Sequence, residues 1–69
     1  MKLYLVYLGG KHKEDLILED HRVFLVVAQN IEQAKEEAKA RWNVDGVHVD
    51  GIKQITEVDK YQIILKKTV

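Results

Sequence analysis

Short apolar runs separated by polar segments dominate the chain. Residues 3–8 and 23–27 are unbroken apolar runs rich in β-branched and aromatic side chains, a pattern typical of buried strands. The last third predicts two further strands, from Val47 to about Ile55 and from Tyr61 to Lys66. Gly51 interrupts the first of these, and a glycine inside a strand indicates a β-bulge or a close approach of another backbone.

The first run is apolar on both of its faces. One face is therefore expected to pack on a helix, whereas the other would need a second layer that a chain of 69 residues can hardly supply. We expect this strand to stop at Gly9-Gly10, where glycine permits backbone angles that other residues avoid. The long connection that follows contains Leu16-Ile17-Leu18, which is interpreted as an extra edge strand or as a plug over one end of the core.

One helix is predicted between the second and third strands. Asn30 is a favourable N-cap, and Gln33 three residues later completes a capping-box pattern. A narrow apolar stripe then recurs at helical spacing, with Ile31, Ala34, Ala38 and Trp42 as its members. Residues 43–46 end the helix, and Gly46 is the expected turn residue.

These elements predict an α+β fold for a single domain spanning residues 1–69. Their order is strand, loop, strand, helix, strand, strand, which indicates a two-layer sandwich with one helix packed on a mostly antiparallel sheet of about four strands. A domain of this size buries only about 60% of the surface of its unfolded chain. The chain has no cysteine, so an efficient core, a metal site without thiolates or self-association must supply the missing stability.

Composition narrows the classes of function. Lys and Arg total 11, as do Asp and Glu, and this balance makes nucleic-acid binding unlikely because it provides no broad basic face. No apolar stretch approaches the ~20 residues of a membrane span. Residues 1–8 are too short for a signal sequence, and a cysteine-free chain suits the cytoplasm. Serine is absent, which excludes serine hydrolysis.

Two acid–histidine pairs are the candidate chemistry. Glu19 and His21 are two residues apart just before the second strand, and His48 and Asp50 have the same spacing within the third. Residues two apart in a strand point to the same face. If the two segments lie side by side, imidazole and carboxylate groups would converge as ligands for a divalent metal or as a proton relay. The alternative is structural, with the pairs facing water or hydrogen-bonded to each other.

The order and spacing of five short pieces resemble the bacterial family known as domain of unknown function 1543. The pieces are Val6-Tyr7-Leu8-Gly9-Gly10, Glu19-x-His21, Trp42, Gly46-Val47-His48-Val49-Asp50 and Val58-Asp59-x-Tyr61. The resemblance implies an α+β domain without an established activity, and it directs attention to Glu19, His21, Trp42, His48 and Asp50. Family members often carry Asp where this chain has Arg22, and Gly where it has Lys60.

Two hypotheses about function follow. The first is a non-enzymatic domain that self-associates, as a homodimer, because its first strand is apolar on both faces. The second is a small module that binds a ligand or a divalent metal through the His/carboxylate residues. The sequence names no particular cofactor, and the Trp42 side chain on the apolar stripe is interpreted first as part of the core.

Overall fold

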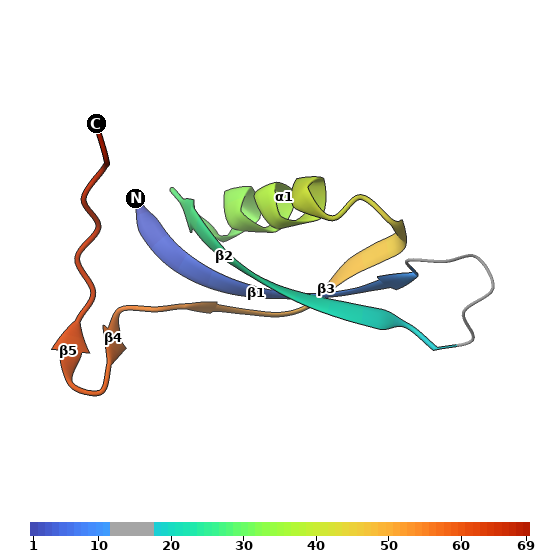
Figure 1. Ribbon diagram of the computed structural model, residues 1–69, viewed down its shortest axis with the longest axis horizontal. Helices are drawn as coiled ribbons and strands as arrows, with labels where there is room; N and C mark the ends of the chain where they lie inside the picture. The colour runs from blue at the N-terminus through green and yellow to red at the C-terminus, as the bar shows by residue number, and fades with distance from the viewer. Residues whose placement is uncertain (12–17) are drawn as a thin grey trace.

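A three-stranded antiparallel sheet with one helix across it forms the body of the protein in a computed structural model, which describes residues 1–11 and 18–69 (Figure 1). The sheet has the order β2-β1-β3 and antiparallel pairing throughout. Its strands are β1 (Lys2–Lys11), β2 (Asp20–Ala28) and β3 (Asp45–Gln54), and the helix is α1 (Ile31–Arg41). The predicted α+β sandwich with one helix on an antiparallel sheet is confirmed.

The core lies between α1 and one face of the sheet. Alternate residues of β1 point to the helix, so Tyr4, Val6 and Leu8 are fully buried beneath it. Ala34 and Ala38 let the helix approach closely, and Trp42 closes the far end of the core. Ile31, by contrast, is 47% exposed. The expectation that it belongs to the buried stripe is wrong, because it begins the helix beyond the part that lies over the sheet.

The start of α1 follows the predicted capping chemistry with one shift. The Asn30 side chain accepts a hydrogen bond of 2.8 Å from the backbone N–H of Gln33. The Gln33 side chain reaches the N–H of Gln29 rather than that of Asn30, at 2.7 Å. At the other end, Trp42 is the C-cap of α1, and its N–H donates to the carbonyl of Lys39. Gly46 has a positive φ of 65° but lies within β3, so the expectation that it is the turn residue ending the helix is wrong.

β1 is longer than the apolar pattern indicates. It continues through Gly9 and Gly10 to Lys11, and both glycines pair with β2. Neither has a positive φ, so the expectation that these glycines end the strand by unusual backbone angles is wrong. Leu18 lies exposed outside any strand, while the rest of the expected edge strand or plug at residues 16–18 falls outside the described residues.

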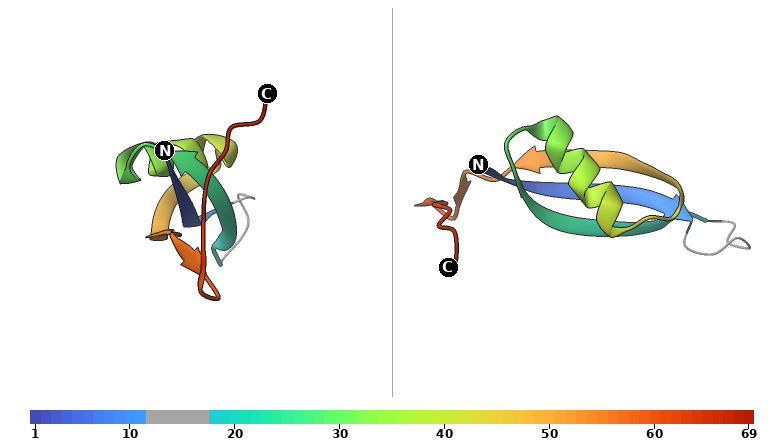
Figure 2. Two further views of the ribbon diagram at one scale, coloured as in Figure 1. Left: turned by 90° about the vertical axis from the view of Figure 1, so that its left-hand side faces the viewer. Right: turned by 90° about the horizontal axis from the view of Figure 1, so that it is seen from above.

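The C-terminal part of the chain leaves the sheet as a separate arm. A two-residue turn at Asp59-Lys60 joins β4 (Glu57–Val58) to β5 (Tyr61–Gln62). Only two residues separate β3 from β4, so this hairpin forms beyond the end of the sheet, on the side away from α1 (Figures 1 and 2). The predicted strand from Tyr61 to Lys66 is therefore wrong beyond Gln62, because residues 63–69 do not pair with another strand.

The molecule is elongated along the direction of the sheet (Figure 1). Its extents are 43 × 26 × 20 Å, and its radius of gyration of 13.8 Å exceeds the roughly 11 Å expected of a compact chain of this length. Within the described ranges, the single helix is too short and too polar to cross a membrane.

Candidate functional site at one end of the sheet

The four residues of the two acid–histidine pairs meet at one end of the sheet, on the face opposite α1. His21 comes from β2, His48 and Asp50 come from β3, and Glu19 lies just before β2. β1 runs between the two outer strands, and its Gly9 is paired with His21 on one side and with His48 on the other. The antiparallel register thus brings together side chains that are 27–31 residues apart in the sequence.

Gly9 provides the space in which these side chains converge. A Cβ atom at this position would lie 2.6 Å from Asp50 Oδ2, 2.9 Å from His48 Nε2 and 3.0 Å from Glu19 Oε2. Any larger residue would push the three groups apart. The sequence reasoning missed this role, although a glycine within a strand pattern is a known signal of close approach.

A β-bulge aims Asp50 at the same place. Tyr7 pairs with Gly51 and Leu8 pairs with Val49, so Asp50 is an extra residue that has no partner on β1. The irregularity that Gly51 predicted in this strand is confirmed. A bulge re-aims the side chain of its extra residue, and here it turns the Asp50 carboxylate toward both histidines.

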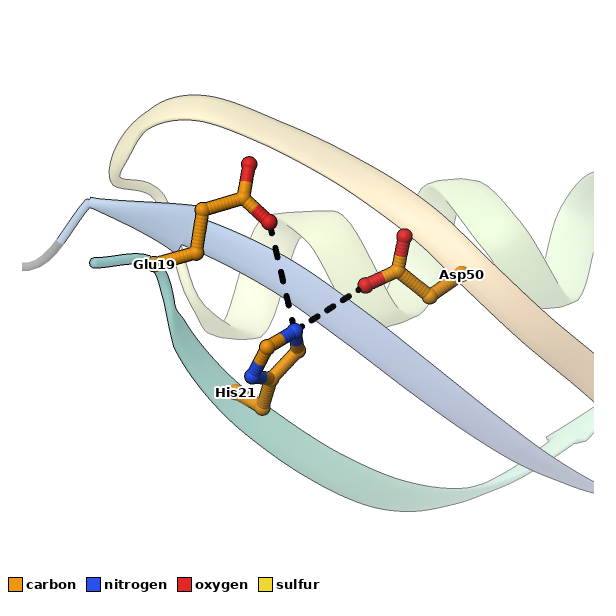
Figure 3. Close-up of side chains that lie close together, drawn as sticks. All are labelled: Glu19, His21 and Asp50. Carbon is orange, nitrogen blue, oxygen red and sulfur yellow. Dashed lines mark ion pairs between the residues drawn. The ribbon is translucent and has the colours of Figure 1, made fainter.

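The ligand atoms of the four residues are close to one another, as Figure 3 shows for Glu19, His21 and Asp50. His21 Nε2 lies 3.2 Å from Asp50 Oδ2 and 3.9 Å from Glu19 Oε2. His48 Nε2 lies 2.9 Å from Asp50 Oδ1 and 3.5 Å from Glu19 Oε2. Each histidine therefore faces both carboxylates, and we call these four residues the His/carboxylate cluster.

His48 is oriented by its second ring nitrogen. Nδ1 lies 2.9 Å from the backbone carbonyl of Gly46, which is a hydrogen-bond acceptor. Nε2 faces the Asp50 carboxylate, which is also an acceptor. Because both ring nitrogens face acceptors, the protonated imidazole is favoured. The Gly46 carbonyl is the largest cause that raises the pKa of His48, and the charges of Asp50 and Glu19 raise it further.

His21 is positioned by an aromatic neighbour. Its ring stacks on the ring of Tyr7, with centroids 5.1 Å apart and planes at 6° to each other. Tyr7 pairs with Val23 on β2, two residues from His21. The stack limits rotation of the imidazole and keeps Nε2 directed at the carboxylates.

Trp42 does not join this cluster. It is 8% exposed and packs in the core on the helix side of the sheet. The guanidinium of Arg22 lies 5.6 Å from the centre of its ring and also pairs with Asp20 at 3.3 Å. Arg22 thus lies on the opposite face of the sheet from His21, and its contacts with Trp42 and Asp20 involve no member of the His/carboxylate cluster.

Three residues of the cluster, Glu19, His21 and Asp50, have ligand atoms that all lie within 4.8 Å of one another and could hold a divalent metal ion. Neighbouring ligand atoms of a tetrahedral zinc ion lie about 3.3–3.4 Å apart, given bonds of about 2.0–2.1 Å. The four separations in the cluster, from 2.9 to 3.9 Å, bracket this value. The side chains are 30–44% exposed, so an ion from solution can reach them. An Nδ1 atom held by a backbone carbonyl is also the usual support of a metal-binding histidine.

The fold and the cluster together define a small α+β domain with a His/carboxylate cluster on the sheet face that the helix leaves open. The family model described as Domain of Unknown Function (DUF1543) matches residues 16–65, well over half of the chain, and the chain belongs to this family. The matched range contains all four cluster residues and begins after β1. No curated protein and no solved structure matches the chain.

Proposed function

We propose that this domain binds a divalent transition-metal ion through the His/carboxylate cluster. The observation that carries the proposal is the convergence of two imidazoles and two carboxylates from two segments of the chain above the bare backbone of Gly9. Glu19, His21 and Asp50 are the ligands whose donor atoms all lie within 4.8 Å of one another. His48 is the fourth ligand, because its Nε2 faces both carboxylates.

The donor types select the class of metal. Imidazole nitrogens favour zinc, nickel, copper and iron over magnesium and calcium, which prefer sites made only of oxygen. Two carboxylates also balance the charge of a divalent ion. In the metal-free protein, protonation of His48, whose pKa is raised, supplies part of the positive charge that the ion would provide. Metal binding therefore releases that proton, and affinity is expected to rise with pH.

A bound ion would cross-link the two outer strands of the sheet. It would join β2 to β3 over β1 and hold the end of the long connection at Glu19. A chain of this size has little core stability to spare. An ion present at 100 times its dissociation constant stabilises a fold by about 2.7 kcal/mol. We therefore propose a non-enzymatic binding role, in which occupancy of the site controls the stability of this end of the domain.

Calorimetric titration of the untagged, chelator-treated protein with zinc and nickel tests the proposal. We expect one ion per chain, and no heat from magnesium. Asp50→Asn should weaken zinc binding at least tenfold, whereas Glu57→Gln, the same change at an exposed acid on the distant hairpin, should leave it unaltered. Equal affinities of the two variants, or no binding of either metal by the wild-type protein, would show that the cluster is not a metal site.

We also propose that the domain self-associates. The support is the second face of β1, where Leu3, Leu5 and Tyr7 point away from the helix and no other described helix or strand covers them. Sedimentation equilibrium over a range of concentrations tests the proposal, with a concentration-dependent mass as the expected result. A constant monomer mass up to millimolar protein would remove it.

A further inference from the structure

The sheet face opposite α1 changes in character from one end to the other. We call it the open face. Its middle is apolar, and the pairing of β1 with β2 sets its side chains in rows: Tyr7 beside Val23, Leu5 beside Leu25 and Leu3 beside Val27. Val23, Leu25 and Val27 are 54%, 59% and 45% exposed. A continuous apolar patch of this kind, rimmed by polar residues, marks a surface that packs against another molecule.

The two ends of the open face carry opposite charge. At the His21 end, the carboxylates of Glu19, Asp45 and Asp50 outnumber the ammonium group of Lys11, which lines a shared hollow with Glu19 and Asp45, and they form an acidic end. At the Val27 end, the arm brings Lys66 and Lys67 next to Val27, where they line a shared hollow with Leu65. These two lysines form a basic end. An acidic end, an apolar middle and a basic end together make a surface that is complementary to itself when turned end to end.

We infer that two copies of this chain pack open face to open face, with their strands antiparallel across the contact. This inference rests on the proposed self-association and names its surface. A two-fold axis through the middle of the face would set Leu5 and Leu25 of one copy against the same residues of the other, as an isologous interface requires. The same axis sets each acidic end against the partner's basic end.

The size of the face indicates a reversible contact. β1 has ten residues, and with a rise of about 3.3 Å per residue and a strand spacing of about 4.8 Å the three strands cover roughly 450–500 Å². A stable interface of standard size buries about 800 Å² on each partner. The β4-β5 hairpin, which stands at the Val27 end of the sheet on the side away from α1 (Figures 1 and 2), must contribute the remainder. A dissociation constant in the micromolar range is therefore expected.

A second copy fits this face better than other partners do. Nucleic acid needs a basic surface, whereas the two lysines of the sheet on this face stand apart: Lys53 lies opposite Leu5, and Lys11 shares a hollow with Glu19 and Asp45. A membrane surface would meet the carboxylates of the acidic end at the same time as the apolar middle. Another copy offers apolar surface to the middle and a charge of the opposite sign to each end.

Sedimentation equilibrium of matched variants tests the inference. Leu25→Glu places a charge at the centre of the open face and should raise the dissociation constant of the dimer at least tenfold. Ile31→Glu makes the same kind of change at a similarly exposed apolar residue on the helix and should leave the constant unaltered. If the Leu25→Glu variant still dimerises, the open face is not the interface, although the chain self-associates. If the wild-type protein is monomeric, both the interface and the proposed self-association are refuted.

Cross-linking keeps the test valid if Leu25→Glu does not fold. The chain has no cysteine, so Leu25→Cys and Ile31→Cys each introduce a single thiol. Facing sheets lie about 10 Å apart, which a short bis-maleimide spans and a disulfide does not. We expect covalent dimers from Leu25→Cys and not from Ile31→Cys. The reverse pattern, or equal cross-linking of both, would contradict the open-face contact.

The direction of packing is tested by charge. The double variant Lys66→Glu/Lys67→Glu should weaken the dimer severalfold, and added salt should weaken the wild-type dimer. Zinc should also weaken it, because an ion at the His/carboxylate cluster neutralises the acidic end. A dimer tightened by zinc would place the two clusters together and overturn the antiparallel arrangement. If zinc does not bind, the metal proposal fails, whereas the lysine variant still decides the direction of packing.

Discussion

Gly9→Ala is the change that most directly tests how the site is built. The added Cβ would lie 2.6 Å from Asp50 Oδ2 and 2.9 Å from His48 Nε2, whereas ordinary contact begins at 3.4 Å. The two ligand atoms must then retreat by about 0.8 and 0.5 Å, which are the differences between these distances. Metal sites hold their ligand distances within about 0.2 Å. We therefore expect zinc affinity to fall at least tenfold, or about 1.4 kcal/mol.

The fold should tolerate this change. Gly9 does not have a positive φ, so alanine suits its backbone, and replacing a glycine restricts the unfolded chain by about 0.4–1 kcal/mol in favour of folding. The atoms that must move are the ends of partly exposed side chains. We expect the free energy of unfolding of the metal-free variant to stay within about 1 kcal/mol of the wild-type value.

Gly51→Ala is the matched control. It lies on the neighbouring strand, where an added Cβ would meet the Cβ of Tyr7 at an ordinary 3.8 Å. Calorimetric titration with zinc and urea unfolding of both variants separate binding from stability. If Gly9→Ala binds zinc within threefold of the wild-type constant, the convergence of side chains over Gly9 does not determine affinity, and the reasoning is refuted.

Three further changes test other parts of the structure. The raised pKa of His48 stabilises the metal-free fold fully below the unfolded value of 6.5, and this stabilisation is lost once the pH exceeds the folded value. The free energy of unfolding measured in urea should therefore decline from about pH 6 upward in the wild-type protein but not in His48→Gln. Parallel pH curves of the two proteins would contradict this. Lys60 has a φ of 69°, so Lys60→Gly should raise the free energy of unfolding by about 0.5–1 kcal/mol, and a lower Tm would argue against it. Leu8 is fully buried, so Leu8→Ala should cost about 2–5 kcal/mol in urea unfolding, and a cost below 1 kcal/mol would show that the core collapses around the gap.

The sequence predicted the body of the fold because periodicity reports burial directly. The unbroken apolar run of residues 3–8 and the Asn30 cap are local signals, and they correspond to β1 and to the start of α1 in the structure. The end of the chain was misjudged for the same reason. Tyr61 to Lys66 has the composition of a strand, yet a segment becomes a strand only where another lies beside it. The two-residue turn at Asp59-Lys60 placed it beyond the sheet.

The sequence predicted the two acid–histidine pairs, but it did not predict that the two pairs meet. The spacing of His48 and Asp50 indicates that they share a face, and the same holds for Glu19 and His21. Whether the two pairs meet depends on the register of two outer strands against β1, and alternation within one strand does not contain that information. Gly9 is the residue that connects the two pairs. Because it has no side chain, the side chains of Glu19, His48 and Asp50 can occupy the space above its backbone.

Tyr7 lies where the proposed metal site and the proposed association surface meet on one face. On the open face of β1, Leu3, Leu5 and Tyr7 form an apolar series that Gly9 ends. Where the series ends, side chains from β2 and β3 close over the backbone, and His21 stacks on Tyr7 at the boundary. A partner that covers Tyr7 therefore also restricts His21, and an ion that fixes His21 also fixes the edge of the apolar surface. We therefore expect the two proposed activities to be coupled through the contact between Tyr7 and His21, so that occupancy of one site changes the other.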